Sequence, residues 1–246
     1  MAIIFLREIE TLKERVLRLS IDVEDRLRQA LLAVANRDAA LASSVMDGDV
    51  EIDRREVAIE EECLKLLALH QPVASDLRFV IATLKVNNDL ERIGDLAVNI
   101  ADRARLLAAA PLPGIRLPID RMGTLSIGML RKVFQAFMEH DARLAAEVVA
   151  SDDEVDDMNR DMIASVVGRM RAGDPSPEAL LLLLGVSREL ERVGDHASNI
   201  AEDLIYMFQG EIVRHHKLDV ARQLPQNGVN GAPADTDSAS SNRSTP

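Results

Sequence analysis

Aromatic side chains are scarce in this chain of 246 residues, which has no tryptophan, one tyrosine and five phenylalanines. Proteins that hold single-stranded nucleic acid stack the bases on aromatic side chains, and this sequence offers very few. Positive charge is in deficit as well, because 29 Lys and Arg residues face 41 Asp and Glu residues, which leaves a net charge of −12. Binding to a phosphate backbone requires clustered basic residues, so the composition argues against nucleic acid as a partner.

Cysteine and long apolar runs are also nearly absent. Cys63 is the only cysteine, which excludes an internal disulfide and is typical of a reducing compartment. The longest apolar run, residues 179–186, is far shorter than the roughly 18 residues that span a membrane. The N-terminus lacks the basic segment and the small-residue cleavage site of a signal peptide. We therefore expect a soluble, cytoplasmic protein.

The chain contains one twelve-residue segment twice. Residues 90–101 read LERIGDLAVNIA and residues 190–201 read LERVGDHASNIA, with nine of the twelve positions identical. A repeat at a spacing of 100 residues indicates two copies of one structural module. The polar positions recur as faithfully as the apolar ones, which a repeat that only maintained a hydrophobic core would not require.

Apolar residues recur at helical spacing in both modules, and interruptions of this pattern mark the ends of helices. Asp38 and Asp141 are the expected N-caps of the second helix of each module. Three prolines and a glycine within residues 109–118 predict a connection between the modules. We expect an all-α protein of two tandem antiparallel three-helix bundles, elongated because helices of about 25–35 residues are about 35–50 Å long. The expected helices are 3–36, 38–70, 73–108, 119–139, a fifth from Asp141 to the turn at 173–175, and 177–209. The expected units are a first bundle at 1–108, a linker at 109–118, a second bundle at 119–217 and a disordered tail at 218–246.

Acidic residues occupy one face of the repeated segment. Glu91 and Asp95 fall within one arc of a helix, on the side opposite the apolar positions. Two more acids, Asp49 and Asp53, lie in the preceding helix. Helices joined by a short connection form an antiparallel hairpin, in which residues equidistant from the turn lie at one level. The midpoint between the two acidic pairs is Pro72, in the predicted turn, so the pairs should face each other.

The second module repeats this arrangement. Asp152 and Asp156 are placed opposite Glu191 and Asp195, and the midpoint again falls in a predicted turn, between residues 173 and 174. We expect the acids to lie on the outside or at the edge of each bundle. The candidate metal ligands are Asp49, Asp53, Glu91, Asp95, Asp152, Asp156, Glu191 and Asp195, with Asn99 and Asn199 as additional candidates.

Such a face has two interpretations. The first is a solvated polar surface, partly neutralised by Arg92 and Arg192. The second is a metal site, because acids four residues apart repel one another and a multivalent cation reverses the sign of that interaction. Oxygen ligands favour Mg²⁺, Mn²⁺, Ca²⁺ or iron over a structural Cys/His zinc site. His196 replaces Leu96 of the first copy, and we expect an exposed helix histidine there rather than a further ligand.

The motifs of this chain resemble those of the PhoU family of phosphate-signalling regulators. They are QPVASDLRF at 71–79, the two LER-x-GD segments, and the D-x-x-[IV]-D stretches at 49–53 and 152–156, and the resemblance spans residues 5–217. It implies two three-helix bundles related by pseudo-twofold symmetry. It also implies that the eight acids bind a multinuclear metal cluster, with iron as the expected metal and magnesium, manganese or zinc as alternatives.

The same resemblance implies a regulator that is not an enzyme. Such a protein would repress the phosphate-starvation regulon when phosphate is plentiful, by linking the ATPase subunit of the phosphate ABC transporter to a sensor histidine kinase. It would be a homodimer that meets the membrane only indirectly, through the transporter. A di-iron carboxylate enzyme requires E-x-x-H pairs, which the sequence lacks. A purely structural helical interaction module without bound metal stays open as an alternative.

Overall fold

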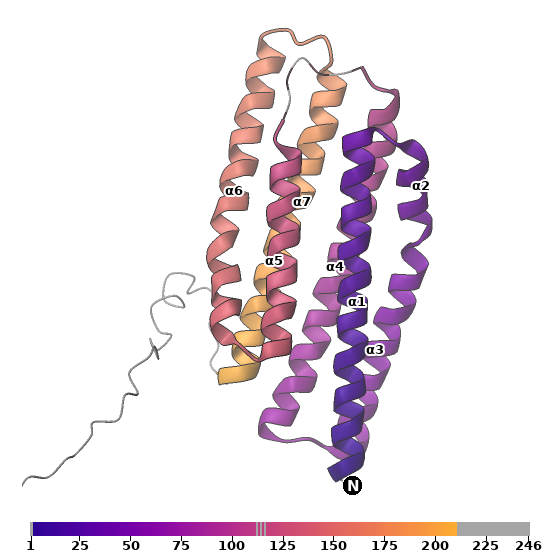
Figure 1. Ribbon diagram of the computed structural model, residues 1–246, viewed down its shortest axis with the longest axis vertical. Coiled ribbons are helices and arrows are strands. Elements are labelled where there is room, and N and C mark those ends of the chain that lie inside the picture. Colours follow the sequence, from indigo (N-terminus) through magenta and orange to yellow (C-terminus); the bar gives the residue numbers. More distant parts are fainter. Residues whose placement is uncertain (1, 112, 114, 116, 211–246) are drawn as a thin grey trace, which may run out of the picture.

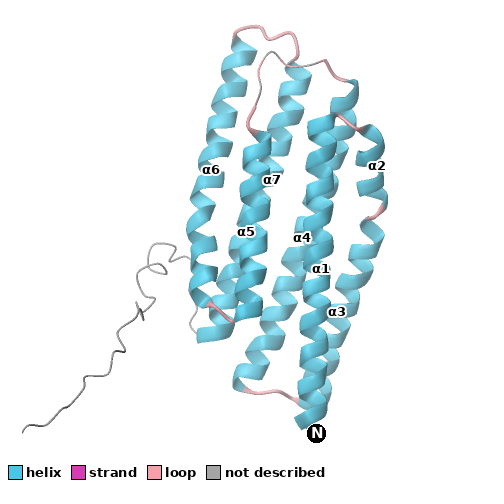
Figure 2. Cartoon of the chain, in the orientation of Figure 1, coloured by secondary structure: helices cyan, strands magenta, loops and turns pink. Residues whose placement is uncertain are grey.

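The computed structural model describes residues 2–111, 113, 115 and 117–210. These ranges are almost entirely helical and contain no strand (Figure 2). The helices are α1 (Ala2–Asn36), α2 (Ala39–Asp47), α3 (Asp49–His70), α4 (Ala74–Ala109), α5 (Ile119–Glu139), α6 (Ala142–Arg171) and α7 (Pro177–Gln209). The all-α prediction is confirmed. The tail predicted at 218–246 lies outside the described residues.

The second helix of each module begins in the same way. Asp38 Oδ1 accepts hydrogen bonds from the N–H groups of two following residues at 3.0 and 2.9 Å, and Asp141 Oδ1 does so at 2.8 and 3.2 Å. Each Asp follows a residue in the left-handed conformation, Arg37 with φ 55° and His140 with φ 53°. These matching turns extend the repeat, at an offset of 103 residues, back to the end of the first helix of each module.

One predicted helix is divided in the structure. We expected a continuous helix over 38–70, but α2 ends at Asp47 and α3 begins at Asp49, with Gly48 between them. Glycine is a weak helix former, and the guanidinium of Arg26 in α1 donates to the carbonyl oxygen of Gly48. A Cβ atom at this position would lie 2.9 Å from Arg26 Nη2. The second module has Ser151 at the equivalent position, and α6 is continuous.

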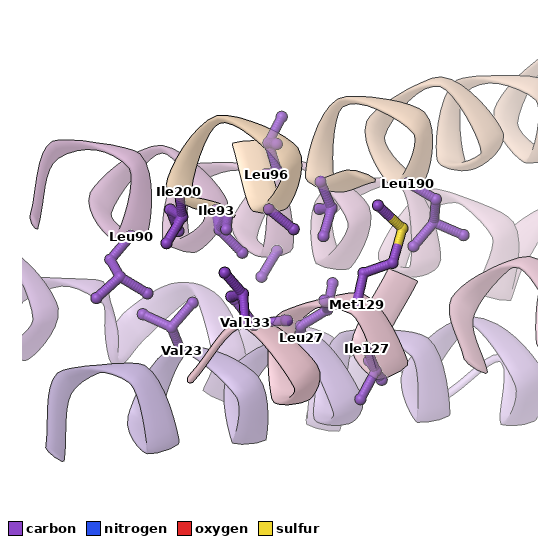
Figure 3. Packing of buried hydrophobic residues seen from close by; sticks show 14 of the residues in the cluster. Val23, Leu27, Leu90, Ile93, Leu96, Ile127, Met129, Val133, Leu190 and Ile200 are labelled. Carbon is purple, nitrogen blue, oxygen red and sulfur yellow. The ribbon is translucent and has the colours of Figure 1, made fainter. Parts of the chain in front are cut away.

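The two bundles lie side by side along a common long axis (Figure 1). The first consists of α1 to α4 and the second of α5 to α7, with α4 against α7 and α1 against α5 at the junction. Buried apolar residues of both bundles form one continuous cluster. Figure 3 shows Val23 and Leu27 of α1 near Val133 of α5, and Leu190 of α7 beside Met129. This described core crosses the boundary between the two bundles. The division of the chain into separate domains stays a prediction.

Two ion pairs and one histidine–carboxylate hydrogen bond also join the bundles. Helices α4 and α7 are antiparallel, since residues later in one contact residues earlier in the other. The pairs are Lys85 with Asp203 at 3.0 Å, Asp89 with His196 at 2.8 Å, and Arg103 with Glu189 at 2.8 Å. All three carboxylates are buried. A buried carboxylate is costly without a partner, so these pairs help to fix how the two bundles meet.

His196 was predicted as an exposed helix residue, with a metal ligand as the alternative. The structure contradicts this expectation of exposure, because the side chain is only 20% exposed and Nδ1 lies 2.8 Å from Asp89 Oδ1 across the junction. The residue therefore contributes to the contact between the bundles. Within the described residues, no helix is long and apolar enough to cross a membrane.

Candidate metal centre

The first acidic site lies between α3 and α4. Asp49 and Asp53 come from the start of α3, and Glu91 and Asp95 come from the middle of α4. Burial is the main cause that raises the pKa of Glu91, and the charge of Asp95 is the next. Asp53 and Asp49 raise it further, which indicates that these acids lie near Glu91. The guanidinium of Arg92 opposes this rise. The two acidic pairs therefore face each other across the hairpin.

Arginine side chains already neutralise part of this first site. Arg26 Nη1 lies 2.8 Å from Asp49 Oδ1. Burial raises the pKa of Asp49 and the guanidinium of Arg26 lowers it, while Asp53 and Asp95 raise it further. Arg92 lies 3.4 Å from Glu91 and 3.5 Å from Asp95. The site thus combines four carboxylates with two guanidinium groups.

Glu56 belongs to the first site and was not among the predicted residues. It lies one turn after Asp53 in α3, and its backbone and side-chain oxygens each accept a 3.0 Å hydrogen bond from Asn87 Nδ2. Burial raises the pKa of Glu56, with Glu60, Glu91 and Asp53 adding to the shift. A search for repeated acids misses this residue because Asn159 stands at the equivalent position of α6.

The second acidic site lies between α6 and α7. Asp152, Asp156 and Asp195 each place one carboxylate oxygen within 4.8 Å of the others. We expected the acids at the surface, but Asp152 is only 1% exposed. It is buried because α6 and α7 approach closely at this level, where Gly194 has no side chain to separate them.

Glu191 is the fourth carboxylate of the second site. Its pKa is raised first by burial and then by Asp195, Asp156 and Asp152 in that order, while Arg192 lowers it. Arg192 also contacts Glu189, at 3.1 Å. At the position that corresponds to Arg26 of the first module, α5 carries Met129. The two sites therefore share their four acids and differ in the groups around them.

The glycine of each LER-x-GD segment allows the two helices of a hairpin to approach at the acidic level. A Cβ atom on Gly194 would lie 3.3 Å from Asp152 Oδ1 and 3.5 Å from Val155. A Cβ atom on Gly94 would lie 3.4 Å from Ile52. The repeated segment thus supplies two acids together with the space that brings the facing acids near them.

The donor set of the second site fits a hard cation. Oxygen ligands bind Mg²⁺ and Ca²⁺ at about 2.0–2.6 Å, so oxygens on opposite sides of one ion are about 4–5 Å apart. The 4.8 Å spread of the three aspartate oxygens is compatible with this spacing. Asn99 and Asn199 are exposed on α4 and α7. Within the described residues, only the second site brings three carboxylates this close together, and the assignment of the eight acids and two amides as ligands stays a prediction.

Comparison with known proteins identifies the family. Residues 16–104 and 119–204 match the PhoU domain, one match in each bundle. A phosphate-specific transport system accessory protein PhoU homolog from Caulobacter vibrioides is 37% identical over 219 residues, which cover 88% of this chain and 95% of that protein.

Solved structures agree with this relationship. The crystal structure of PhoU from Pseudomonas aeruginosa is 35% identical, with a TM-score of 0.79 over 84% of this chain and 100% of that chain. The phosphate transport system regulatory protein PhoU from Streptococcus pneumoniae is 33% identical, with a TM-score of 0.80 over 85% of this chain and 99% of that chain. With two matching domains in tandem and the same helical fold, this chain belongs to the PhoU family.

Proposed function

We propose that this protein is a metal-binding, non-enzymatic regulator of phosphate uptake and phosphate-starvation signalling. The observation that carries the metal-binding part is the pair of acidic sites, each built from two adjacent helices around a glycine. The regulatory part is supported by the relatives, which are named accessory or regulatory proteins of phosphate transport systems.

A bound cation has a clear physical role in this fold. Burial and neighbouring acids raise the pKa values of Glu91 and Glu191, so ionisation of these groups costs more free energy in the folded, metal-free protein than in the unfolded chain. A multivalent cation favours the ionised form and draws α3 to α4 and α6 to α7. We propose a multinuclear cluster, with iron as the expected metal and magnesium, manganese or zinc as alternatives.

The proposed partners are the ATPase subunit of the phosphate ABC transporter and a sensor histidine kinase. The protein would act in the cytoplasm, as a homodimer, and would meet the membrane only through the transporter. In this role it would repress the phosphate-starvation regulon when phosphate is plentiful. The fold supports an adaptor of this kind, because two elongated bundles offer several long helix faces to partner proteins (Figure 1).

Elemental analysis of purified protein tests the metal sites. We expect bound metal in the wild type, a partial loss in Glu91→Ala/Asp95→Ala and in Glu191→Ala/Asp195→Ala, and little metal when all four substitutions are combined. Asp157→Ala/Asp161→Ala is a matched control, because both acids are exposed on α6 and lie outside the candidate site. Equal, near-zero metal content in all of these proteins would contradict metal binding.

A cellular measurement tests the regulatory role. Deletion of the gene should raise the expression of phosphate-scavenging genes in phosphate-rich medium, and re-expression of the wild type should restore repression. The four-acid variant separates the two parts of the proposal. If it restores repression fully while it binds no metal, the alternative of a purely structural helical interaction module describes the protein better.

A further inference from the structure

A pocket lined by arginines lies on the first bundle, and none of the eight candidate metal ligands lines it. It has a volume of about 370 Å³ between α1 and α3 and is lined by Arg15, Arg18, Arg54, Arg55, Ala58 and Ile59. We call it the arginine pocket. Its lining includes no acidic residue, although the whole chain carries a net charge of −12. This cluster of four guanidinium groups is therefore a positively charged region on a protein whose net charge is negative.

Nearby acids offset only part of this positive charge. Glu51 contacts Arg54 at 2.7 Å and Arg55 at 2.8 Å, and Asp22 also pairs with Arg55. Arg15 of α1 makes a longer contact, with Glu62 at 3.8 Å. Within the described part of the chain, Arg18 forms no ion pair. Four positive groups thus face three carboxylates, and the least neutralised pair, at positions 15 and 18, comes from one turn of α1.

The contact with Glu51 shows what these arginines can hold. Arg54 donates to both oxygens of the Glu51 carboxylate, from Nε at 2.9 Å and Nη2 at 2.7 Å, and Arg55 Nε adds a third hydrogen bond at 2.8 Å. This two-point geometry is the one in which guanidinium groups bind carboxylate and phosphate oxygens. Two of the four lining arginines therefore already hold one oxyanion, the carboxylate of Glu51, which lies outside the lining of the pocket.

The second module does not repeat the arginine pocket. The positions that correspond to Arg18, Arg54 and Arg55 carry Arg121, Asp157 and Met158. The position of Ala58 corresponds to Asp161. The equivalent surface of α6 is thus acidic. A general requirement of the fold would apply to both modules, so the arginine pocket is a feature of the first module alone.

We propose that the arginine pocket binds a small condensed phosphate, such as pyrophosphate or tripolyphosphate. Its volume lies near the lower end of the about 300–1,000 Å³ typical of small-molecule sites, which leaves room for more than one phosphoryl group. Several guanidinium groups favour a ligand with several negative charges over a single carboxylate. The lining has no aromatic side chain to stack against a nucleobase. The lining shares no residue with the eight candidate metal ligands, and the proposal does not depend on metal binding.

Calorimetric titration of the full chain with tripolyphosphate at low salt tests this site. The titration is made on metal-free protein without divalent cations, so that it does not depend on metal binding. We expect saturable binding of one ligand per chain and at least about a tenfold loss of affinity in Arg15→Gln/Arg18→Gln, a loss equal to about 1.4 kcal/mol. Arg121→Gln is the matched control, because Arg121 is the exposed counterpart of Arg18, and it should bind as the wild type does.

Two further titrations sharpen the test. Glu51→Gln removes the carboxylate that occupies Arg54 and Arg55, and we expect it to raise the affinity severalfold. Citrate carries three carboxylates and should bind more weakly than tripolyphosphate. The proposal is overturned by the absence of saturable binding at millimolar ligand, by an equal loss in Arg121→Gln, by weaker binding in Glu51→Gln, or by citrate binding as tightly as tripolyphosphate. Thermal unfolding of each variant confirms that it is folded.

Discussion

The guanidinium of Arg26 lies 2.8 Å from the carboxylate of Asp49, one of the candidate metal ligands of the first site. Arg26 also donates to the carbonyl oxygen of Gly48, at the break between α2 and α3. The equivalent positions of the second module carry Met129 and Ser151, and the helix there is unbroken. The first site therefore already contains a positively charged side chain. A metal ion that binds Asp49 must displace the Arg26 guanidinium or bind beside it.

Substitution of Arg26 should strengthen cation binding at the first site. We expect Arg26→Met to raise the affinity for Mn²⁺ there by about tenfold, because one competing positive charge is lost. Titration in the Glu191→Ala/Asp195→Ala background isolates the first site. Arg28→Met is the control, because Arg28 pairs with Glu24 and Asp25 instead. Unchanged or weaker Mn²⁺ binding in Arg26→Met would show that Asp49 is not a ligand.

The stability of the metal-free protein should depend on the pH through the acidic sites. The pKa values of Glu91 and Glu191 are raised above 4.5 in the folded protein, chiefly by burial. These groups bind more protons when folded than when unfolded, so the free energy of unfolding falls as the pH rises through the window above 4.5. Glu191→Gln removes one of these groups. The free energy of unfolding is measured by urea denaturation at about pH 5 and about pH 7. It should fall less between these two pH values in Glu191→Gln than in the wild type.

Protons and metal ions compete for the same carboxylates. Saturating metal should therefore reduce the pH dependence of stability in the wild type more than in Glu91→Gln/Glu191→Gln. An identical pH dependence of the wild type and this double variant without metal would contradict the raised pKa values.

The glycine at the second site should tolerate a methyl group poorly. A Cβ atom on Gly194 would crowd Asp152, so Gly194→Ala should lower the metal content of the second site. At Gly168 a Cβ atom meets nothing within 4 Å, and Gly168→Ala should stabilise the protein by about 0.5–1 kcal/mol through helix propensity alone. Denaturant unfolding and elemental analysis of both variants provide the comparison. A gain of stability in Gly194→Ala equal to that in Gly168→Ala would contradict the close approach of the helices.

The hydrogen-bonded pair of His196 and Asp89 should stabilise the junction of the bundles. His196→Leu introduces the residue of the first repeat and leaves the buried Asp89 carboxylate without its imidazole partner. We expect a loss of about 1–3 kcal/mol in the free energy of unfolding. The further change Asp89→Asn should recover part of it, because an amide is less costly to bury than a charge. Full stability of His196→Leu alone would show that the pair contributes nothing.

Helical periodicity and the internal repeat predict most of the fold. Asp38 and Asp141 were expected as N-caps, and both accept the predicted backbone hydrogen bonds. The symmetry of the hairpin about Pro72 placed Asp49 and Asp53 opposite Glu91 and Asp95. In the structure, Asp95, Asp53 and Asp49 all raise the pKa of Glu91. These features follow from local propensity and hairpin geometry, which a single sequence contains.

The features that the sequence did not predict arise from contacts between distant helices. Arg26 neutralises Asp49 from α1, and His196 reaches Asp89 in the other bundle. Nothing in the local pattern around either residue indicates such a partner. The depth of Asp152 depends on how closely α6 and α7 approach, and periodicity places a side chain on a face of a helix without fixing that distance. Prediction from repeats also overlooks residues that only one module has.

Anomalous diffraction from crystals grown with manganese tests the central proposal most directly. We predict anomalous peaks at two positions, one between α3 and α4 within coordination distance of Asp49, Asp53, Glu91 and Asp95, and one between α6 and α7 beside Asp152, Asp156, Glu191 and Asp195. Peaks elsewhere, or no peaks at these eight carboxylates in crystals soaked at millimolar manganese, would contradict the assignment of these acids as a metal centre.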